Sequence, residues 1–284
     1  KMKTVNSLSG GKTSSYIAKH YPADANVFSL VRTDDRDCLF PDKKIRQIVS
    51  DKLGKEFIGT LEQDTIIYTM LDLEQFIGQE IDWISGETFD NIIKRKDKIY
   101  LPNKVQRFCT IEMKIKPIFY WWAGKFNKEI VEMRIGFRAN EQKRAKNMLD
   151  RCIDGVEYMK GTWEKSDSGR NKWQTIPYRI PVFPLINDGI FKDNIENYWK
   201  DKNVRFAYAN NCVGCFHRNA VMLKHMSNKS PKQFNWFVKQ EEQNKNQNAR
   251  FKREITYRDI KNSFNQFELF DDDFTDCDSG YCGL

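Results

Sequence analysis

Short apolar runs alternate with amphipathic segments along the first part of the chain. Residues 3–8 predict a buried first strand, and residues 26–31, a short apolar run bounded by polar residues, predict a second. Residues 14–20 and 42–53 predict helices, the second because its apolar positions recur at helical spacing. Residues 56–59 predict a third strand. Repeated strand–helix–strand units favour a parallel sheet covered by helices, so the expected class is α/β.

The rest of the chain carries further helices and one change of pattern. A further strand is expected at residues 130–136, and helices are expected at residues 65–78, 87–95, 110–119, 187–200 and 231–243. Residues 155–184 differ, because a turn at 166–169 separates two segments rich in Thr, Trp, Tyr and Val, which predicts a β-hairpin insertion. We expect one Rossmann-like domain over residues 1–206, and a small helical, cysteine-bearing region over residues 207–284.

Composition is that of a globular protein. Of 284 residues, 40% are hydrophobic and 30% are charged. No apolar run approaches the roughly 20 residues that cross a bilayer, and residues 1–8 lack the apolar core of a signal peptide. These features predict a cytoplasmic protein with no membrane partner.

Charge is unevenly distributed. The net charge is +8, yet the residues from Glu268 onward hold six acids and no Lys or Arg, so the preceding residues carry six more positive charges, or +14. A body this basic suggests a polyanionic partner, either a nucleotide or a nucleic acid, although a solvated Lys-rich surface has the same composition. Aromatic side chains of the hairpin can stack on bases or simply pack.

A glycine-rich turn follows the first expected strand. It consists of Ser9, Gly10, Gly11, Lys12, Thr13 and Ser14. Glycines let the backbone turn tightly, and the amides at the start of the next helix favour phosphate oxygens. A lysine adds a full positive charge and the serines add hydroxyl donors. The turn therefore predicts a phosphate-binding loop, although it is not the GxxxxGK[ST] type, which needs Gly where Asn6 stands.

This loop resembles the pyrophosphate loop of the adenine nucleotide α-hydrolases, usually written SGGKDS, with Thr13 in place of the Asp. Three further segments resemble the phosphoadenosine phosphosulfate (PAPS) reductase family within that superfamily. They are Thr33-Asp34-Asp35 with Phe40-Pro41-Asp42, then Arg107-Phe108-Cys109-Thr110 with Lys114 and Pro117, and Gly136-Phe137-Arg138 with Glu141 and Arg144. The resemblance implies a HUP-type Rossmann-like sheet.

The resemblance also implies roles for the matching residues. Lys12, Arg107, Lys114 and Arg138 would be catalytic, and the loop residues Ser9 to Ser14 with Arg144 would bind the nucleotide. The nucleotide would be ATP, normally with Mg²⁺, or PAPS. Independently of the family, four cations could converge on a multiply charged ligand, since arginine offers a paired fork to phosphate or sulfate oxygens. They are Arg107, Lys114, Arg138 and Arg144.

The seven cysteines include two pairs. Cys212 and Cys215 form a CxxC motif, and Cys277 and Cys282 form a CxxxxC pair. Two such pairs can close a four-thiolate site around Zn²⁺ or hold a [4Fe–4S] cluster. Alternatively, Cys282 is a redox nucleophile, because the final Cys-Gly-Leu resembles the ECGLH segment of sulfonucleotide reductases. Cys109 is expected to be a small buried residue, and His217 an ordinary surface residue or a ligand.

Three functions remain open on these observations. The first is an enzyme that adenylates a carbonyl oxygen of a nucleic acid or nucleotide and then transfers sulfur or nitrogen to it, with a sulfur donor protein as partner. DNA phosphorothioation sulfur-transfer proteins are relatives of that kind. The second is a PAPS reductase that releases sulfite with Cys282 and thioredoxin. The third is a metal-stapled, non-enzymatic module that binds DNA or RNA.

Overall fold

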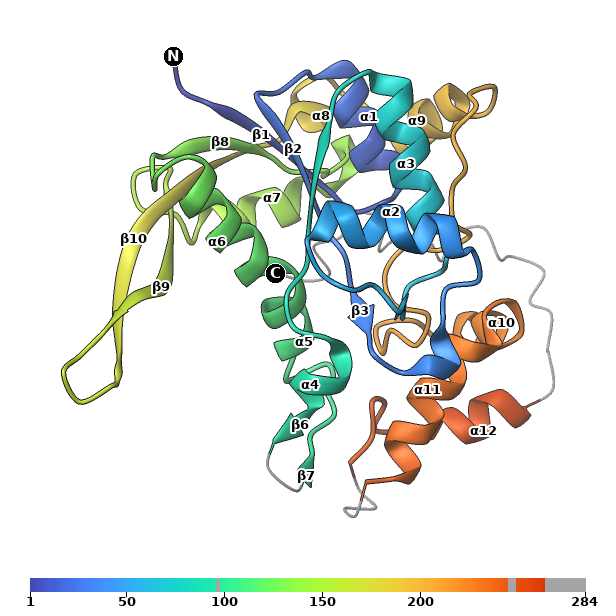
Figure 1. The fold of residues 1–284 in the computed structure, drawn as a ribbon. Coiled ribbons are helices and arrows are strands. Elements are labelled where there is room, and N and C mark those ends of the chain that lie inside the picture. The colour runs from blue at the N-terminus through green and yellow to red at the C-terminus, as the bar shows by residue number, and fades with distance from the viewer. Residues whose placement is uncertain (96–97, 245–248, 264–284) are drawn as a thin grey trace.

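The computed structural model describes residues 1–95, 98–244 and 249–263 (Figure 1). Within these residues the main sheet has six strands in the order β5-β2-β1-β8-β10-β9. The strands are β1 (Thr4–Leu8), β2 (Ala25–Ser29), β5 (Ile81–Ile84), β8 (Val131–Arg134), β9 (Glu157–Lys165) and β10 (Asn171–Val182). All neighbours pair in parallel except β9 and β10. The expected α/β class with a mostly parallel, helix-flanked sheet is confirmed.

Helices cover both faces of the sheet. Since successive strand residues point to opposite sides, β1 and β2 each contribute to two apolar clusters. Leu8 and Phe28 pack in one apolar cluster with α1 (Lys12–His20), α2 (Lys43–Leu53), α3 (Thr65–Ile77) and α9 (Lys192–Trp199). Val5 and Val27 pack in another with α6 (Lys116–Lys125) and α7 (Gln142–Leu149). Because both faces are covered, all five residues of β2 and three of the five residues of β1 are buried.

The expected third strand at residues 56–59 is wrong as a member of the main sheet. Only β4 (Gly59–Thr60) forms there, and it pairs antiparallel with β3 (Arg32–Thr33) outside that sheet. A β carbon at Gly59 would lie 2.0 Å from the carbonyl oxygen of Cys38, so this backbone runs against another backbone segment. The third strand on this side is β5, whose four residues were too few to signal a strand.

The hairpin expected at residues 155–184 is confirmed as β9 and β10, with Gly169 at a φ of 75° in its turn. It is more than an insertion, because the second half of β10 pairs in parallel with β8 and extends the main sheet. The helix expected at residues 187–200 forms as α9, which begins only at Lys192, and a short helix α8 (Pro184–Asn187) precedes it. Gly189, with a φ of 66°, lies between them.

The helix expected at residues 110–119 forms as three consecutive pieces. These are α5 (Phe108–Thr110), a π-helical turn η2 (Ile111–Ile115) and α6. Pro117 has no amide hydrogen to donate to the carbonyl of Met113, four residues earlier. The hydroxyl of Ser29 donates to that carbonyl instead, at 2.7 Å. The π turn holds Lys114, and such turns often occur at functional sites.

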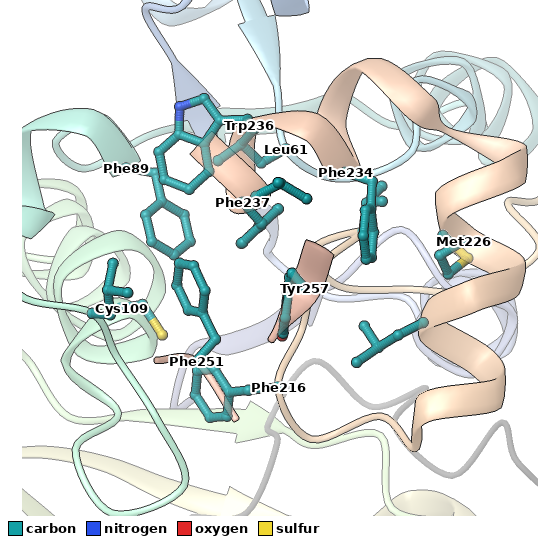
Figure 2. Packing of buried hydrophobic residues seen from close by; sticks show 14 of the residues in the cluster. Leu61, Phe89, Cys109, Phe216, Met226, Phe234, Trp236, Phe237, Phe251 and Tyr257 are labelled. Atoms are coloured by element: carbon teal, nitrogen blue, oxygen red, sulfur yellow. The ribbon is translucent and has the colours of Figure 1, made fainter. Parts of the chain in front are cut away.

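The C-terminal part consists of α10 (Ala220–Lys229), α11 (Pro231–Glu242) and α12 (Tyr257–Asn262). These helices share one buried cluster with Leu61, Phe89 and Cys109 from the first half of the chain (Figure 2). The smaller elements are η1 (Arg36–Cys38), α4 (Phe89–Ile93), β6 (Lys94–Arg95), β7 (Lys98–Ile99) and η3 (Ala139–Glu141). Among the described residues, no helix has both the length and the apolar content for crossing a membrane.

Candidate functional site

The turn between β1 and α1 is held tightly. Gly10 has a φ of 78°, and a β carbon there would lie 2.6 Å from Cγ2 of Ile66 on α3. The amide of Ser9 donates to Oγ of Ser14 at 3.1 Å, and that hydroxyl lies 3.2 Å from the carbonyl oxygen of Gly11. Gly11 is the N-cap of α1 and makes no side-chain cap, so the first amides of the helix have no partner within the helix.

The loop lies where the chain changes direction across the sheet. From β1 the chain passes through α1 to β2 and later to β5, whereas β8 and β10 lie on the other side of β1. Crevices at the carboxyl ends of such neighbouring strands are the usual ligand sites of open α/β sheets. Gly136, just after β8, approaches the loop, because its β carbon would lie 3.4 Å from Cγ2 of Thr13. Two of the sequence segments therefore meet at the carboxyl ends of β1 and β8.

The loop is covered in this structure. Ser9, Thr13 and Ser14 are 8%, 2% and 3% exposed. Nζ of Lys12 forms an ion pair with Glu196 of α9 and lies 6.0 Å from the ring centroid of Phe206. The carbonyl of Lys12 accepts a hydrogen bond from the indole of Trp199 at 3.0 Å. A phosphate bound here has to displace Glu196 from Lys12, since both are anions.

Arg138 and Arg144 share one carboxylate at the start of α7. Nε of Arg138 lies 3.1 Å from Oε2 of Glu141, while Arg144 pairs with the other oxygen and lies 4.5 Å from the centroid of the Phe137 ring. Arg138 is only 4% exposed. These arginines therefore follow the carboxyl end of β8 and Gly136.

The other two predicted cations lie with the cysteines. Lys114 forms an ion pair with Glu62 at 2.9 Å, and Glu62 is fully buried. Its second carboxylate oxygen, Oε2, has no hydrogen-bond partner among the described residues. Arg107 lies near His217 and lowers its pKa. The four cations thus form two groups, one after β8 and one at the CxxC segment.

The CxxC segment forms a hydrogen-bonded turn. The amide of Cys215 donates to the carbonyl of Cys212 at 3.0 Å, and the amide of Val213 donates to the carbonyl of Leu61 at 2.8 Å. A β carbon at Gly214 would lie 2.4 Å from the ring of Phe237, so glycine is required here. The hydroxyl of Tyr257 donates to the carbonyl of Gly214 at 2.9 Å. The turn is therefore fixed by residues far from it in sequence.

Three cysteines line one small cavity of about 50 Å³, namely Cys109, Cys212 and Cys215, together with His217 and Lys114. Burial raises the pKa of Cys109 to about 11, and burial followed by the charge of Glu62 raises the pKa of Cys212 well above its ordinary value. These thiols are therefore protonated at neutral pH. Sequence reasoning missed Cys109 as a member of this group, because a lone cysteine has no spacing rule that links it to a distant CxxC.

These thiols do not yet form a coordination sphere. Within the described ranges, no group of three or more Cys, His, Asp or Glu side chains is arranged to hold a metal ion. Cys277 and Cys282, the other two predicted ligands, lie outside the described residues. The soft sulfur donors of Cys212 and Cys215 suit Zn²⁺ or an iron–sulfur cluster chemically.

His217 is surrounded by positive charge. Burial and the charges of Arg107, Lys104 and Lys252 lower the pKa of His217 to about 4. Its Nε2 is buried and has no hydrogen-bond partner among the described residues. This convergence of cations was not expected from the sequence, where residues 104–107, His217 and Lys252 lie in three separate segments.

One short segment joins the loop to the cysteines. Leu61 accepts the hydrogen bond of Val213, Glu62 pairs with Lys114, and Ile66 packs on Gly10. Five residues of chain span about 18 Å at most, so the phosphate loop and the cysteine cavity lie within roughly 20 Å of each other.

Comparison of the chain with protein-family models, curated proteins and solved structures finds no match. Its function therefore has to be argued from the geometry described above.

Proposed function

We propose that the chain is an ATP-dependent enzyme of the pyrophosphate-loop type that adenylates a nucleic acid or nucleotide for sulfur transfer or a similar modification. The observation that carries the proposal is the bend at Gly10, which is held against Ile66 at the carboxyl end of β1, next to β8. A bend of this kind presents backbone amides and one lysine to phosphate oxygens.

The proposed chemistry has two steps. In the first, a carbonyl oxygen of the acceptor attacks the α-phosphorus of ATP, and the bond to the bridging oxygen breaks, releasing pyrophosphate with its electron pair. In the second, a sulfur or nitrogen nucleophile attacks the activated carbon and AMP leaves. Lys12 and the amides of α1 would stabilise the charge on the phosphates, and Mg²⁺ would arrive with the nucleotide. Arg138 and Arg144 follow the carboxyl end of the neighbouring strand β8 and would bind the other phosphate oxygens.

We further propose that Cys212 and Cys215, with Cys277 and Cys282, hold Zn²⁺ or an iron–sulfur cluster. Either group would fix the thiolates and keep them deprotonated. The short distance between this region and the loop supports an acceptor that reaches both.

The test is release of pyrophosphate from ATP by the purified full chain with Mg²⁺, with and without DNA or RNA. Lys12→Ala should lower turnover by roughly 100-fold, the size seen when a donor to developing charge is removed. Lys19→Ala, on the same helix and exposed, is the matched control and should leave turnover unchanged. Sulfite release from PAPS with thioredoxin, in the absence of pyrophosphate release, would refute the proposal in favour of a reductase.

A further inference from the structure

A large groove lies beside the cysteine cavity. It has a volume of about 980 Å³ and is lined by residues 98–101, 103–106 and 249–254, together with Phe216, Gln243 and Asn244. Phe216 also lines the small cavity that holds Cys109, Cys212 and Cys215. The groove and the thiols are therefore neighbours.

The groove is strongly basic. Its only acid among the described lining residues is Glu254, and the cations of that lining are Lys98, Lys104, Arg250, Lys252 and Arg253. Among the described residues, the lining of the groove therefore carries a clear excess of positive charge. A cleft lined by one sign of charge focuses its field and attracts the opposite charge.

Two of these cations are held close to each other. Nζ of Lys252 donates to the carbonyls of Phe216 and Arg218 at 3.3 and 2.8 Å, which fixes it at the end of the groove. Burial and the nearby charge of Lys104 lower the pKa of Lys252. Both lysines also lie near His217, whose buried Nε2 lacks a partner among the described residues. An anion at this point would relieve the repulsion between the lysines.

The groove also offers apolar contact. Tyr100 is 44% exposed and Val105 is 91% exposed. Basic side chains that follow a phosphate backbone, combined with an aromatic ring on which a base stacks, are the usual means of binding single strands. A duplex keeps its bases stacked on one another, so it cannot use the ring of Tyr100 in this way.

We propose that this groove binds a single strand of DNA or RNA, with Lys104 and Lys252 on a phosphate next to the cysteine cavity. The inference rests on the proposed function in one respect, because the bound strand would be the acceptor that the enzyme modifies. It is nevertheless a statement about binding and can be tested without ATP.

The experiment measures fluorescence anisotropy of a labelled single-stranded DNA of about 12 nucleotides, a length within the range of known single-strand sites. It uses the full chain without nucleotide. The double variant Lys104→Glu/Arg253→Glu changes two exposed groove residues. We expect its Kd to rise at least tenfold and the slope of log K against log salt concentration to become shallower, since fewer counterions are released.

The matched control is Lys43→Glu/Lys44→Glu. It changes the net charge equally at two exposed residues of α2 that do not line the groove. Its Kd should change less than about twofold. Equal weakening in both double variants would overturn the inference, because the DNA would then be attracted by the net charge of the whole protein and not by the groove. Tighter binding of a duplex of the same sequence would overturn it as well.

The inference and the proposed function can fail separately. Lys12→Ala should bind the oligonucleotide with wild-type affinity, because Lys12 belongs to the phosphate loop and does not line the groove. If the groove variant loses binding while ATP turnover is never found, the adenylation proposal fails and the nucleic-acid groove stands.

Discussion

Gly10 and Ile66 are in such close contact that a β carbon on the glycine would lie 2.6 Å from Cγ2 of the isoleucine. The glycine also has a φ of 78°. Gly10→Ala therefore combines a backbone cost with a steric clash, and we expect it to lower the free energy of unfolding by about 2–4 kcal/mol. Denaturation by urea measures this change, and ATP turnover should fall with it.

Gly54 provides the control for that prediction. It has a φ of 63°, and nothing lies within 4 Å of a β carbon there. Gly54→Ala should cost about 1 kcal/mol, the backbone contribution alone. Equal losses in the two variants would show that the contact with Ile66 does not constrain the loop.

Glu196 competes with phosphate for Lys12 in the proposed site. Their side chains are 38% and 33% exposed, so the ion pair is worth about 1 kcal/mol or less. Glu196→Gln should therefore tighten ATP binding by up to about fivefold, as measured by calorimetry. Asp193→Asn on the same helix removes a carboxylate that makes no ion pair with Lys12 and serves as the control. Weaker ATP binding in Glu196→Gln would mean that the carboxylate helps to hold the ligand.

Metal binding should depend on Cys212 and on pH. Because burial raises the pKa of this thiol well above its ordinary value, uptake of Zn²⁺ has to release a proton, and affinity should rise steadily with pH throughout the range below that pKa. Cys212→Ser should lose bound metal by elemental analysis, whereas Cys152→Ser, at a cysteine outside the cavity, should retain it. Full metal content in Cys212→Ser would remove this residue from the ligand set.

Cys109 calls for a separate variant, since it lines the cavity although its sequence context did not mark it as a ligand. Loss of metal in Cys109→Ser would make it a ligand alongside the CxxC pair. Retention of metal would leave it as a packing residue of the buried cluster.

Asp64 makes stability depend on pH. Burial raises its pKa to about 6, against the opposing effects of Lys232 and Gln233. The folded state therefore holds this proton more tightly than the unfolded state, whose pKa is about 3.9. The contribution of Asp64 is fully present below pH of about 4 and is lost as pH rises to about 6, a change of roughly 3 kcal/mol.

Asp64→Asn removes that titration and keeps an oxygen for the amide of Gln233, which donates to Asp64 at 3.0 Å. Asparagine, however, lacks the carboxylate charge that is favourable at the start of α3, and this loss offsets part of the gain. We therefore expect a net gain of about 1–2 kcal/mol in unfolding free energy at pH 7. The gain should shrink towards zero near pH 4. Urea denaturation of both proteins across this range measures it. A gain that is independent of pH would show that Asp64 does not titrate as described.

The local parts of the site could be predicted from sequence. The strand, the glycine turn and the helix at residues 3–20 are encoded by neighbouring residues, and the structure has all three. Glu196 could not be predicted as the partner of Lys12, because the two are separated by 184 positions and no periodicity relates them. The same holds for Ile66 against Gly10, and for Cys109 beside the CxxC pair. Tertiary packing alone brings these residues together.

The short segment from Leu61 to Ile66 has a consequence for how this chain tolerates changes in length. It is bonded to the CxxC turn at one end and packed on the phosphate loop at the other. Adding or deleting one residue within it would shift one contact or the other out of place. The hairpin turn around Gly169, which is exposed and has open space at its β-carbon position, imposes no such limit. Natural variation in length is therefore expected at the hairpin and should be absent from residues 61–66.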